Sequence, residues 1–207
     1  LHHTRRACTP GGRAESDIHH CRSRTTELGV SGGDLPASTG EVGLLAILRT
    51  LVAWDVDFVV IGGVAVGHHG YPRATKDLDV VPSPRPESIE QLWKALLELA
   101  AQPHTLGEFR PEELPAPFSL AGLLLGGNWD LDTKYGRLDI LQQREGALET
   151  REDYLRLRAS AVPESHDFGT VWVAGYDELI DLKTLAGRDQ DLVDIRALRE
   201  ANDDTAP

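Results

Sequence analysis

The sequence predicts an α+β fold, in which a mixed β-sheet is flanked by α-helices and completed by C-terminal helices. Three observations predict it. Residues 57–61 and 75–81 are short β-branched runs of strand length. Residues 128–132 and 137–141 are strand-like segments on either side of a Lys-Tyr-Gly turn, which is the pattern of a β-hairpin. Segments with helical periodicity separate these strands, which indicates helices packed against the sheet.

Composition and charge exclude several classes of protein. The chain has 207 residues, of which 41% are hydrophobic and 26% charged, as in an ordinary globular domain. Its net charge of −12 argues against non-specific nucleic-acid binding and allows at most a local basic patch. No apolar run approaches the roughly 18 residues that a membrane span needs. Neither cysteine, Cys8 or Cys21, has the spacing of a zinc site, and no secretory signal begins the chain. We therefore expect a cytoplasmic protein with no membrane contact.

The composition changes along the chain and suggests three parts. Residues 1–40 are rich in Gly, Ser, Thr, Arg and His and have almost no apolar periodicity. Such a stretch cannot bury enough surface to fold, so we expect a disordered leader or residues added to the natural chain. Residues 41–145 should form the core that contains the sheet. Residues 146–207 should add a C-terminal helical part to the same domain.

The elements of the core follow one another with recognisable signals. Residues 41–52 form an amphipathic helix that leads into the first strand. After the second strand, residues 87–101 carry an apolar stripe with helical spacing. Residues 103–117 contain several prolines and are interpreted as a loop that covers the cleft.

The C-terminal part is predicted to be mainly helical. Residues 150–159 form a polar helix with acidic residues first and arginines last, as the helix dipole prefers. Residues 170–174 are a short strand. Residues 177–186 form a helix that ends at Gly187, and Asp189 can cap the helix that follows.

The second predicted strand carries the most informative residues. Side chains alternate along a strand, so Thr75, Asp77 and Asp79 share one face. Two neighbouring carboxylates repel each other unless a cation lies between them, and hard oxygen ligands of this kind suit Mg²⁺. Gly62-Gly63 precede a short helix, where the backbone can approach an anion closely. Together these features predict a phosphoryl or nucleotidyl transfer site.

Asp139 is the candidate third carboxylate. It lies mid-strand on the face opposite to Leu138 and Ile140, where a charge is costly unless a cation or hydrogen bonds satisfy it. A salt bridge to Arg137 or to a neighbouring strand is the alternative. If the register differs, Asp130 and Asp132 are the substitutes.

These residues resemble a known family. Gly62-Gly63, Arg73, Thr75, Asp77 and Asp79 are similar to the signature of the DNA polymerase β-type nucleotidyltransferase superfamily, and most closely to the AbiEii/MenT-type toxins of toxin–antitoxin systems. The resemblance implies that Asp77, Asp79 and a third carboxylate on a neighbouring strand, here Asp139, bind the catalytic metal. It implies that Gly62-Gly63 contact the nucleotide phosphates. Many members have serine at the second glycine, so Thr75 would have to supply the hydroxyl.

A second segment adds to the resemblance. Lys183, the Gly187-Arg188 turn, Asp191 and Asp194 match a lysine and an aspartate-rich helix in the small toxin-type enzymes. This implies that Lys183 is catalytic and meets the triphosphate, with no partner inside the protein, and that Arg188 and Asp191 also bind nucleotide. From the residues alone, Lys183 would be a solvated helix lysine, and Arg188 and Asp191 a helix-capping ion pair.

The expected function is the transfer of a nucleoside monophosphate from an NTP to an acceptor hydroxyl, with release of pyrophosphate. It would depend on Mg²⁺, or on Mn²⁺ in its place. The resemblance implies a toxin that modifies the tRNA 3′ end and blocks translation, with a cognate antitoxin as protein partner. The cations expected near the cleft, which would form the RNA-binding patch, are Arg73, Lys76, Lys134, Arg137, Lys183 and Arg188.

Two alternatives remain open. One keeps the enzyme and changes the acceptor to a protein hydroxyl (AMPylation) or to a small molecule of the aminoglycoside type, which the acidic charge balance suits better than RNA. The other is a catalytically inactive module that binds a nucleotide or a partner. The intact Asp77, Asp79 and Asp139 argue against this second alternative.

Overall fold

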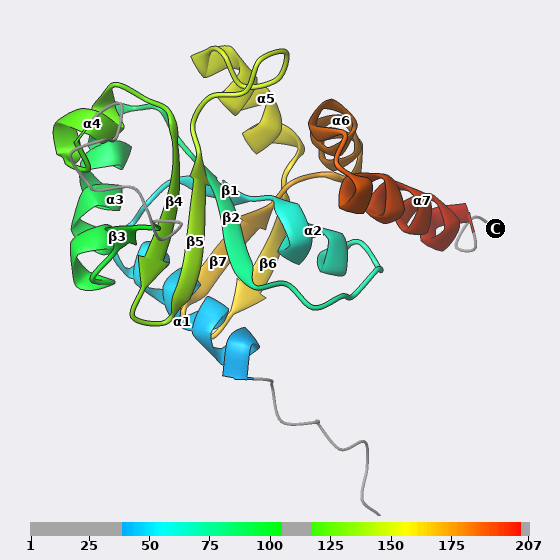
Figure 1. The fold of residues 1–207 in the computed structure, drawn as a ribbon, viewed down its shortest axis with the longest axis horizontal. Coiled ribbons are helices and arrows are strands. Elements are labelled where there is room, and N and C mark those ends of the chain that lie inside the picture. Colours follow the sequence, from blue (N-terminus) through cyan, green and yellow to red (C-terminus); the bar gives the residue numbers. More distant parts are fainter. Residues whose placement is uncertain (1–38, 105–116, 204–207) are drawn as a thin grey trace, which may run out of the picture. The chain divides into compact units, whose positions relative to one another are not determined.

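A seven-stranded mixed sheet forms the centre of the computed structural model, which describes residues 39–104 and 117–203. These residues belong to one compact unit, 36–207. The sheet has the order β3-β4-β5-β2-β1-β7-β6 and helices pack against it, with two more at the C-terminal end (Figure 1). The predicted α+β class and mixed sheet are confirmed. Residues 1–38 of the predicted leader and 105–116 of the predicted loop lie outside the described residues.

The strands are short and their pairing is mixed. β2 pairs antiparallel with β1 and parallel with β5, β1 also pairs parallel with β7, and the hairpins β4–β5 and β6–β7 complete the sheet. The strand bounds are β1 Phe58–Val60, β2 Asp77–Pro82, β3 Gln102–Pro103, β4 Asn128–Thr133, β5 Gly136–Leu141, β6 Val162–His166 and β7 Gly169–Val173.

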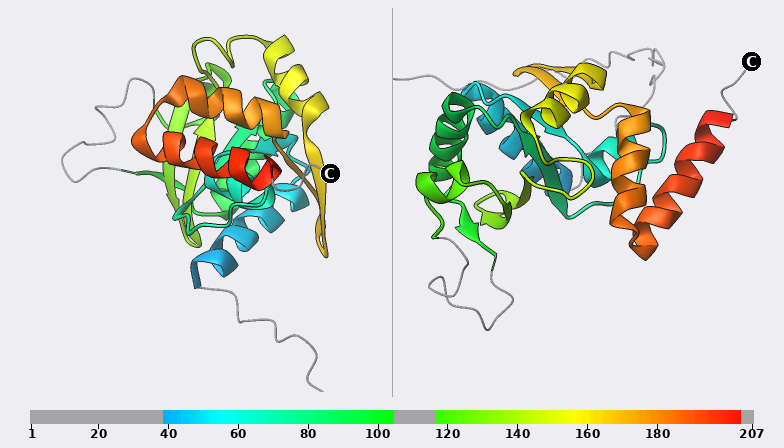
Figure 2. Two further views of the ribbon diagram at one scale, coloured as in Figure 1. Left: turned by 90° about the vertical axis from the view of Figure 1, so that its right-hand side faces the viewer. Right: turned by 90° about the horizontal axis from the view of Figure 1, so that it is seen from above.

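The described residues contain seven helices. Their bounds are α1 Thr39–Ala53, α2 Gly62–His68, α3 Pro86–Glu98, α4 Leu120–Leu124, α5 Arg151–Ser160, α6 Tyr176–Ala186 and α7 Asp189–Asp203. The helices α6 and α7 lie side by side (Figure 2). None of the helices among the described residues has both the length and the apolar character needed to cross a membrane.

The two faces of the sheet differ in chemistry. Leu78 and Val80 of β2 are fully buried, and the register Val60↔Val80 and Val60↔Val173 continues their face into β1 and β7. The helices α1 and α3 contact this face and cover it with apolar side chains. Asp77 and Asp79 alternate with Leu78 and Val80 and therefore point to the opposite face. The fold thus separates an apolar core face from a face that carries carboxylates.

Local signals explain most element ends. Thr150 accepts a hydrogen bond from Asp153 N–H while the Asp153 carboxylate accepts one from Thr150 N–H, so a capping box begins α5. Gly187 has φ 64° and ends α6, as predicted. The helix predicted to reach residue 101 ends at Glu98, and Ala100 has the positive φ of 52°.

Three elements were not predicted: β3, α4 and β6. Of these, β6 contains Pro163 and lies at the edge of the sheet, where a strand can be polar on both faces. Its sequence therefore lacks the alternation of apolar and polar residues that indicates a strand.

Candidate active site

The register between β2 and β5 brings the predicted carboxylates together. Asp79 lies opposite Asp139, and Asp77 lies opposite Arg137. On the other side of β5, Asp139 is opposite Asp130. Directly opposite residues on neighbouring strands share a face. Asp79, Asp139 and Asp130 therefore form one row across three strands, with Asp77 in the adjacent row.

This row carries more negative charge than its surroundings neutralise. Burial, together with the charges of Asp130, Asp79 and Asp77, raises the pKa of Asp139 to about 7. Its Oδ1 atom is buried and finds no hydrogen-bond partner among the described residues. Burial and the neighbouring Asp77 likewise raise the pKa of Asp79, which the hydrogen bond from the Gly63 backbone N–H offsets only in part. Arg137 also has a buried Nε without a partner in the described part of the chain.

The donor set fits a hard cation. Carboxylate oxygens that repel one another, one of them without a partner, gain most from a divalent ion of the Mg²⁺ type, which takes its other ligands from water and phosphate. Within residues 39–104 and 117–203, no group of three or more His, Cys, Asp or Glu side chains is already arranged to hold a metal. The carboxylates are thus gathered by the register, and the remaining ligands would have to come from water or a substrate.

The two glycines are required by close approach to β2. Gly62 has φ 64°, and a Cβ at this position would overlap the Asp79 carboxylate. A Cβ on Gly63 would lie 2.6 Å from Thr75 Oγ1. The Thr75 hydroxyl therefore occupies the space beside Gly63 and donates a hydrogen bond to Asp77 Oδ1 at 3.0 Å. A threonine hydroxyl does lie beside the second glycine, as the absence of a serine there had suggested.

Lys183 is buried and paired. Its Nζ donates to Asp191 Oδ1 at 3.1 Å and to Asp194 Oδ2 at 2.7 Å, and the residue is only 4% exposed. The interpretation of Lys183 as a solvated lysine is wrong, because the packing of α6 against α7 encloses its side chain. The expectation that it has no partner inside the protein is also wrong. The ion pair between Arg188 and Asp191 is present, with 2.7 Å between Nε and Oδ2.

Asp194 is the centre of this network, and the sequence analysis did not include it among the site residues. It also accepts two hydrogen bonds from Arg73, at 2.8 and 2.9 Å, across 121 residues of sequence. Burial would raise the pKa of Asp194, but hydrogen bonds from Arg73, Lys183 and Gln190 outweigh it and lower the pKa to about 2. The available sequence signal was the three-residue spacing from Asp191, which places both carboxylates on one face of α7.

The carboxylates of β2 and β5 lie close enough to the charged residues around α6 and α7 for the two clusters to shift each other's pKa values. The charges of Arg188 and Lys183 offset part of the rise in the pKa of Asp79 that burial and Asp77 cause. Hydrogen bonds to Asp194 and Asp191 raise the pKa values of Arg73 and Arg188, and the charges of Asp77 and Asp79 add to both increases. The structure therefore brings the two predicted segments to one place. On one side lie Asp77, Asp79 and Asp139 with Gly62, Gly63 and Thr75, and on the other lie Lys183, Arg188 and Asp191.

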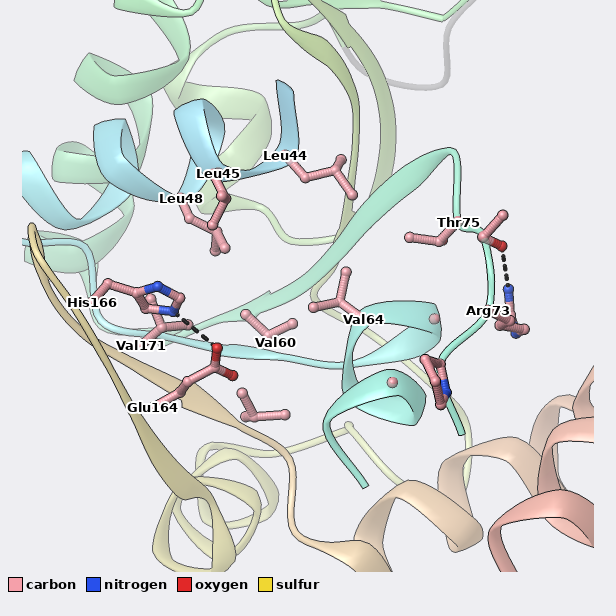
Figure 3. Close-up of a pocket in the computed structure, with 15 residues that line it drawn as sticks. Leu44, Leu45, Leu48, Val60, Val64, Arg73, Thr75, Glu164, His166 and Val171 are labelled. Carbon is pink, nitrogen blue, oxygen red and sulfur yellow. Dashed lines mark hydrogen bonds and ion pairs between the residues drawn. The ribbon is translucent and has the colours of Figure 1, made fainter. Parts of the chain in front are cut away.

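A pocket of about 600 Å³ borders this site, and we call it the α1–β6 pocket (Figure 3). Gly63, Arg73 and Thr75 form one end of it, and Glu164 and His166 of β6 lie at the other. Leucines of α1 and valines of β1, α2 and β7 form its walls: Leu44, Leu45, Leu48, Val60, Val64, Val171 and Val173. The sequence analysis did not predict this pocket, because β6 had no strand signal.

Solved structures resemble the chain at a low level. The lincosamide antibiotic adenylyltransferase LnuA, lincomycin-bound, shares 14% identity over 78% of this chain and 97% of its own, with a TM-score of 0.48. The nucleotidyltransferase-like antigenic protein from Paracoccidioides brasiliensis shares 16% identity over 77% of this chain and 74% of its own, with a TM-score of 0.47. ANT(2″)-Ia in complex with adenylyl-2″-tobramycin shares 15% identity over 76% of this chain and 87% of its own, with a TM-score of 0.46. No family model and no curated protein matches the chain. Similarity at this level does not assign an activity or a substrate to the chain.

Proposed function

We propose that the protein transfers a nucleoside monophosphate from an NTP to an acceptor hydroxyl and releases pyrophosphate. One observation carries the proposal: the β2–β5 register places Asp79 opposite Asp139, with Asp77 in the next row and Gly62-Gly63 directly beside them. A helix cap or a surface ion pair would not need three partly buried carboxylates on one sheet face without matching cations. A metal-dependent site for phosphate chemistry does need them.

Each carboxylate has a distinct role in this proposal. Asp77 and Asp79 would hold Mg²⁺, or Mn²⁺ in its place, and Asp139 would complete the set of metal ligands. The bound ion would supply Lewis-acid stabilisation of the α-phosphate and of the pyrophosphate leaving group. Asp139 lies between Asp79 of β2 and the exposed Asp130 of β4, on the side of Asp79 away from β1. This position suits a base that takes the proton of the acceptor hydroxyl.

The neighbouring residues would hold the nucleotide. Gly62 and Gly63 leave room for phosphate oxygens, and Thr75 Oγ1 keeps Asp77 in position through its hydrogen bond. The Gly63 N–H is directed to Asp79, so a phosphate would have to share or replace that bond. Arg188 is largely exposed and can turn toward a triphosphate. The predicted contact of Lys183 and Asp191 with nucleotide stays a prediction, and both side chains hold the network that positions Arg73 and Arg188.

For the acceptor we propose the tRNA 3′ end, which would make the protein a toxin that blocks translation in the cytoplasm, with an antitoxin as partner. Lys76 and Lys134 are exposed and lie close to the strands that carry Asp77 and Arg137. Three of the other expected cations, Arg73, Lys183 and Arg188, already pair with Asp191 or Asp194. The basic patch is therefore small, and tRNA binding should be weak, strongly salt-dependent and centred on the single-stranded end.

One observation favours a second candidate acceptor. Asp130 and Asp132 are exposed on β4, where Asp130 extends the row of Asp79 and Asp139 and Asp132 extends the row of Asp77 and Arg137. An acidic approach to the site attracts cations and repels phosphates. A small cationic molecule with a hydroxyl is therefore the alternative acceptor.

The test is transfer of α-labelled nucleotide from each of the four NTPs to deacylated tRNA, to total protein or to an aminoglycoside. We expect transfer that chelation of the metal abolishes and added Mg²⁺ restores. Asp77→Asn and Asp79→Asn should each reduce it by at least about 100-fold. Glu90→Gln, on the exposed surface of α3, is the matched control. Wild-type turnover in either Asp variant would overturn the assignment of the metal site, and transfer to protein or aminoglycoside alone would overturn the tRNA assignment.

A further inference from the structure

The α1–β6 pocket lies on the opposite face of the sheet from the candidate active site. Val60, Val171 and Val173 line it, and the register places them on the face of Val80. Glu164 pairs with Val171 and His166 with Gly169, so the side chains of β6 that line the pocket point to this face as well. Asp79 and Asp139 point the other way. A molecule in this pocket therefore lies on the other side of the sheet from Asp79 and Asp139 and meets the proposed active site only at the wall of Gly63 and Thr75.

The pocket has apolar walls and two polar ends. Among the described residues no Phe, Tyr or Trp side chain lines it, and the imidazole of His166 is its aromatic ring, so its walls offer mainly aliphatic contacts. At the β6 end, Glu164 Oε2 is hydrogen-bonded to His68 Nδ1 at 2.9 Å, and its Oε1 lies 3.2 Å from His166 Nε2 in an ion-pair contact. At the other end lie Thr75 and Arg73, well separated from Glu164 (Figure 3).

Glu164 keeps capacity for a further partner. Its side chain is 39% exposed, and each carboxylate oxygen has received only one imidazole nitrogen. A carboxylate has about four acceptor positions, so two remain for a ligand. A protein of net charge −12 also attracts cations. A ligand with a cationic group at Glu164 and an aliphatic chain along the leucines of α1 would neutralise the carboxylate and match the apolar walls.

We propose that the α1–β6 pocket is a binding site for an aliphatic amine, next to the site of nucleotidyl transfer and on the opposite face of the sheet. Its volume of about 600 Å³ lies within the usual range of small-molecule sites. The ammonium group donates to Glu164 and the carbon chain packs on Leu45 and Leu48.

Occupation of this pocket should also change nucleotide binding, a consequence that rests on the proposed function. Gly63 and Thr75 form a wall that the pocket shares with the active site, and Thr75 Oγ1 bonds to Asp77. A ligand that orders this wall alters how the backbone at Gly63 and the carboxylate of Asp77 can meet a phosphate and its metal. The amine is therefore an effector of the enzyme and not its acceptor.

The first experiment measures binding without any nucleotide, using n-hexylamine and its neutral analogue 1-hexanol in isothermal titration. We expect saturable binding of hexylamine to the wild type. Glu164→Gln should weaken hexylamine about tenfold and leave hexanol unchanged, because it removes one charged hydrogen bond and no apolar surface. Leu45→Gln should weaken both probes. Glu90→Gln is the matched control and should bind both as the wild type does.

The outcomes separate this proposal from the proposed function. Absence of saturable hexylamine binding, or equal affinity in the wild type and Glu164→Gln, overturns the amine site. Hexylamine binding that leaves the affinity for the preferred NTP unchanged overturns the effector role. If no NTP is bound or transferred while hexylamine binds as expected, the proposed function fails and the amine site stands.

Discussion

Asp79 and Asp194 carry the same side chain in neighbouring parts of the molecule, but the pKa of Asp79 is raised whereas that of Asp194 is lowered to about 2. Asp194 is fully buried and accepts hydrogen bonds from Arg73, Lys183 and Gln190. Asp79 receives one backbone N–H and has Asp77 beside it. Burial penalises both carboxylates, and the number of cationic donors decides the sign of the shift.

This difference distinguishes a structural group from one prepared to bind a ligand. The α6–α7 group consists of Lys183, Arg188, Asp191 and Asp194, together with Arg73. Its charges pair with one another, so removing any member lowers the stability of the folded protein. The β2–β5 group consists of Asp77, Asp79 and Asp139. Its charges lack partners, which lowers the stability of the free protein and gives a cation a favourable place to bind. The predictions below break or sharpen this comparison in the free energy of unfolding, from the largest expected effect to the smallest.

Lys183→Met should lower the free energy of unfolding by about 3–5 kcal/mol, because it leaves Asp191 and Asp194 buried with one cation fewer. The measurement is urea denaturation without nucleotide. The control is Lys94→Met, at an exposed position of α3, which should change little. This replaces the expectation that Lys183 acts on the triphosphate alone. A Lys183→Met protein as stable as the wild type would contradict the pairing in the structure.

Acid should weaken the α6–α7 group selectively. The folded pKa of Asp194 is about 2 and its ordinary value is 3.8, so the unfolded chain binds more protons between these values. Its stabilisation of roughly 2 kcal/mol is therefore present above about pH 4 and is lost as the pH falls toward 2.

The measurement for this acid effect is urea denaturation at a series of pH values from about 5 to 2. Asp194→Asn should be less stable than the wild type at neutral pH, and the difference should shrink as the pH falls. A difference that stays constant over this range would show that the Asp194 carboxylate does not titrate with the predicted pKa.

Asp79→Asn should have the opposite effect on stability. The amide removes the repulsion with Asp77 and can still accept the Gly63 N–H, so the free energy of unfolding should rise by up to about 1 kcal/mol. Thermal and urea unfolding without divalent ions measure it. Added Mg²⁺ should reduce the difference in the free energy of unfolding between Asp79→Asn and the wild type, because it stabilises only the wild type. A clear loss of stability in the variant would place Asp79 among the structural carboxylates.

Arg188→Gln should cause the smallest change, at most about 1 kcal/mol. Its side chain is 76% exposed although it bonds to the buried Asp191, and exposed ion pairs contribute little. Arg73 is the matched comparison, because its side chain is only 24% exposed and it makes two bonds to Asp194. In urea denaturation, the free energy of unfolding of Arg73→Gln should be well below that of Arg188→Gln. Equal stabilities would contradict the difference in burial.

Local patterns in the sequence were enough for the carboxylate face and the elements that carry it. Alternation in β2 separated Asp77 and Asp79 from Leu78 and Val80, and the burial pattern agrees. The Lys-Tyr-Gly turn predicted the β4–β5 hairpin and hence the orientation of Asp139. These features depend on neighbours within a few residues, so strand period and turn chemistry determine them.

The environment of each charge was decided by the tertiary structure. The partners of Lys183 and Asp194 depend on how α6 packs on α7, and Arg73 joins them from 121 residues away. The parallel pairing of β2 with β5, which puts Asp79 opposite Asp139, joins segments separated by about sixty residues and has no local signal. The α1–β6 pocket likewise exists only because a polar edge strand pairs with β7 beneath α1. The sequence by itself determined which residue types share a strand or helix face. Their burial and their distances to other charges arise from contacts between distant segments, and these set the pKa values and hence which carboxylates are structural.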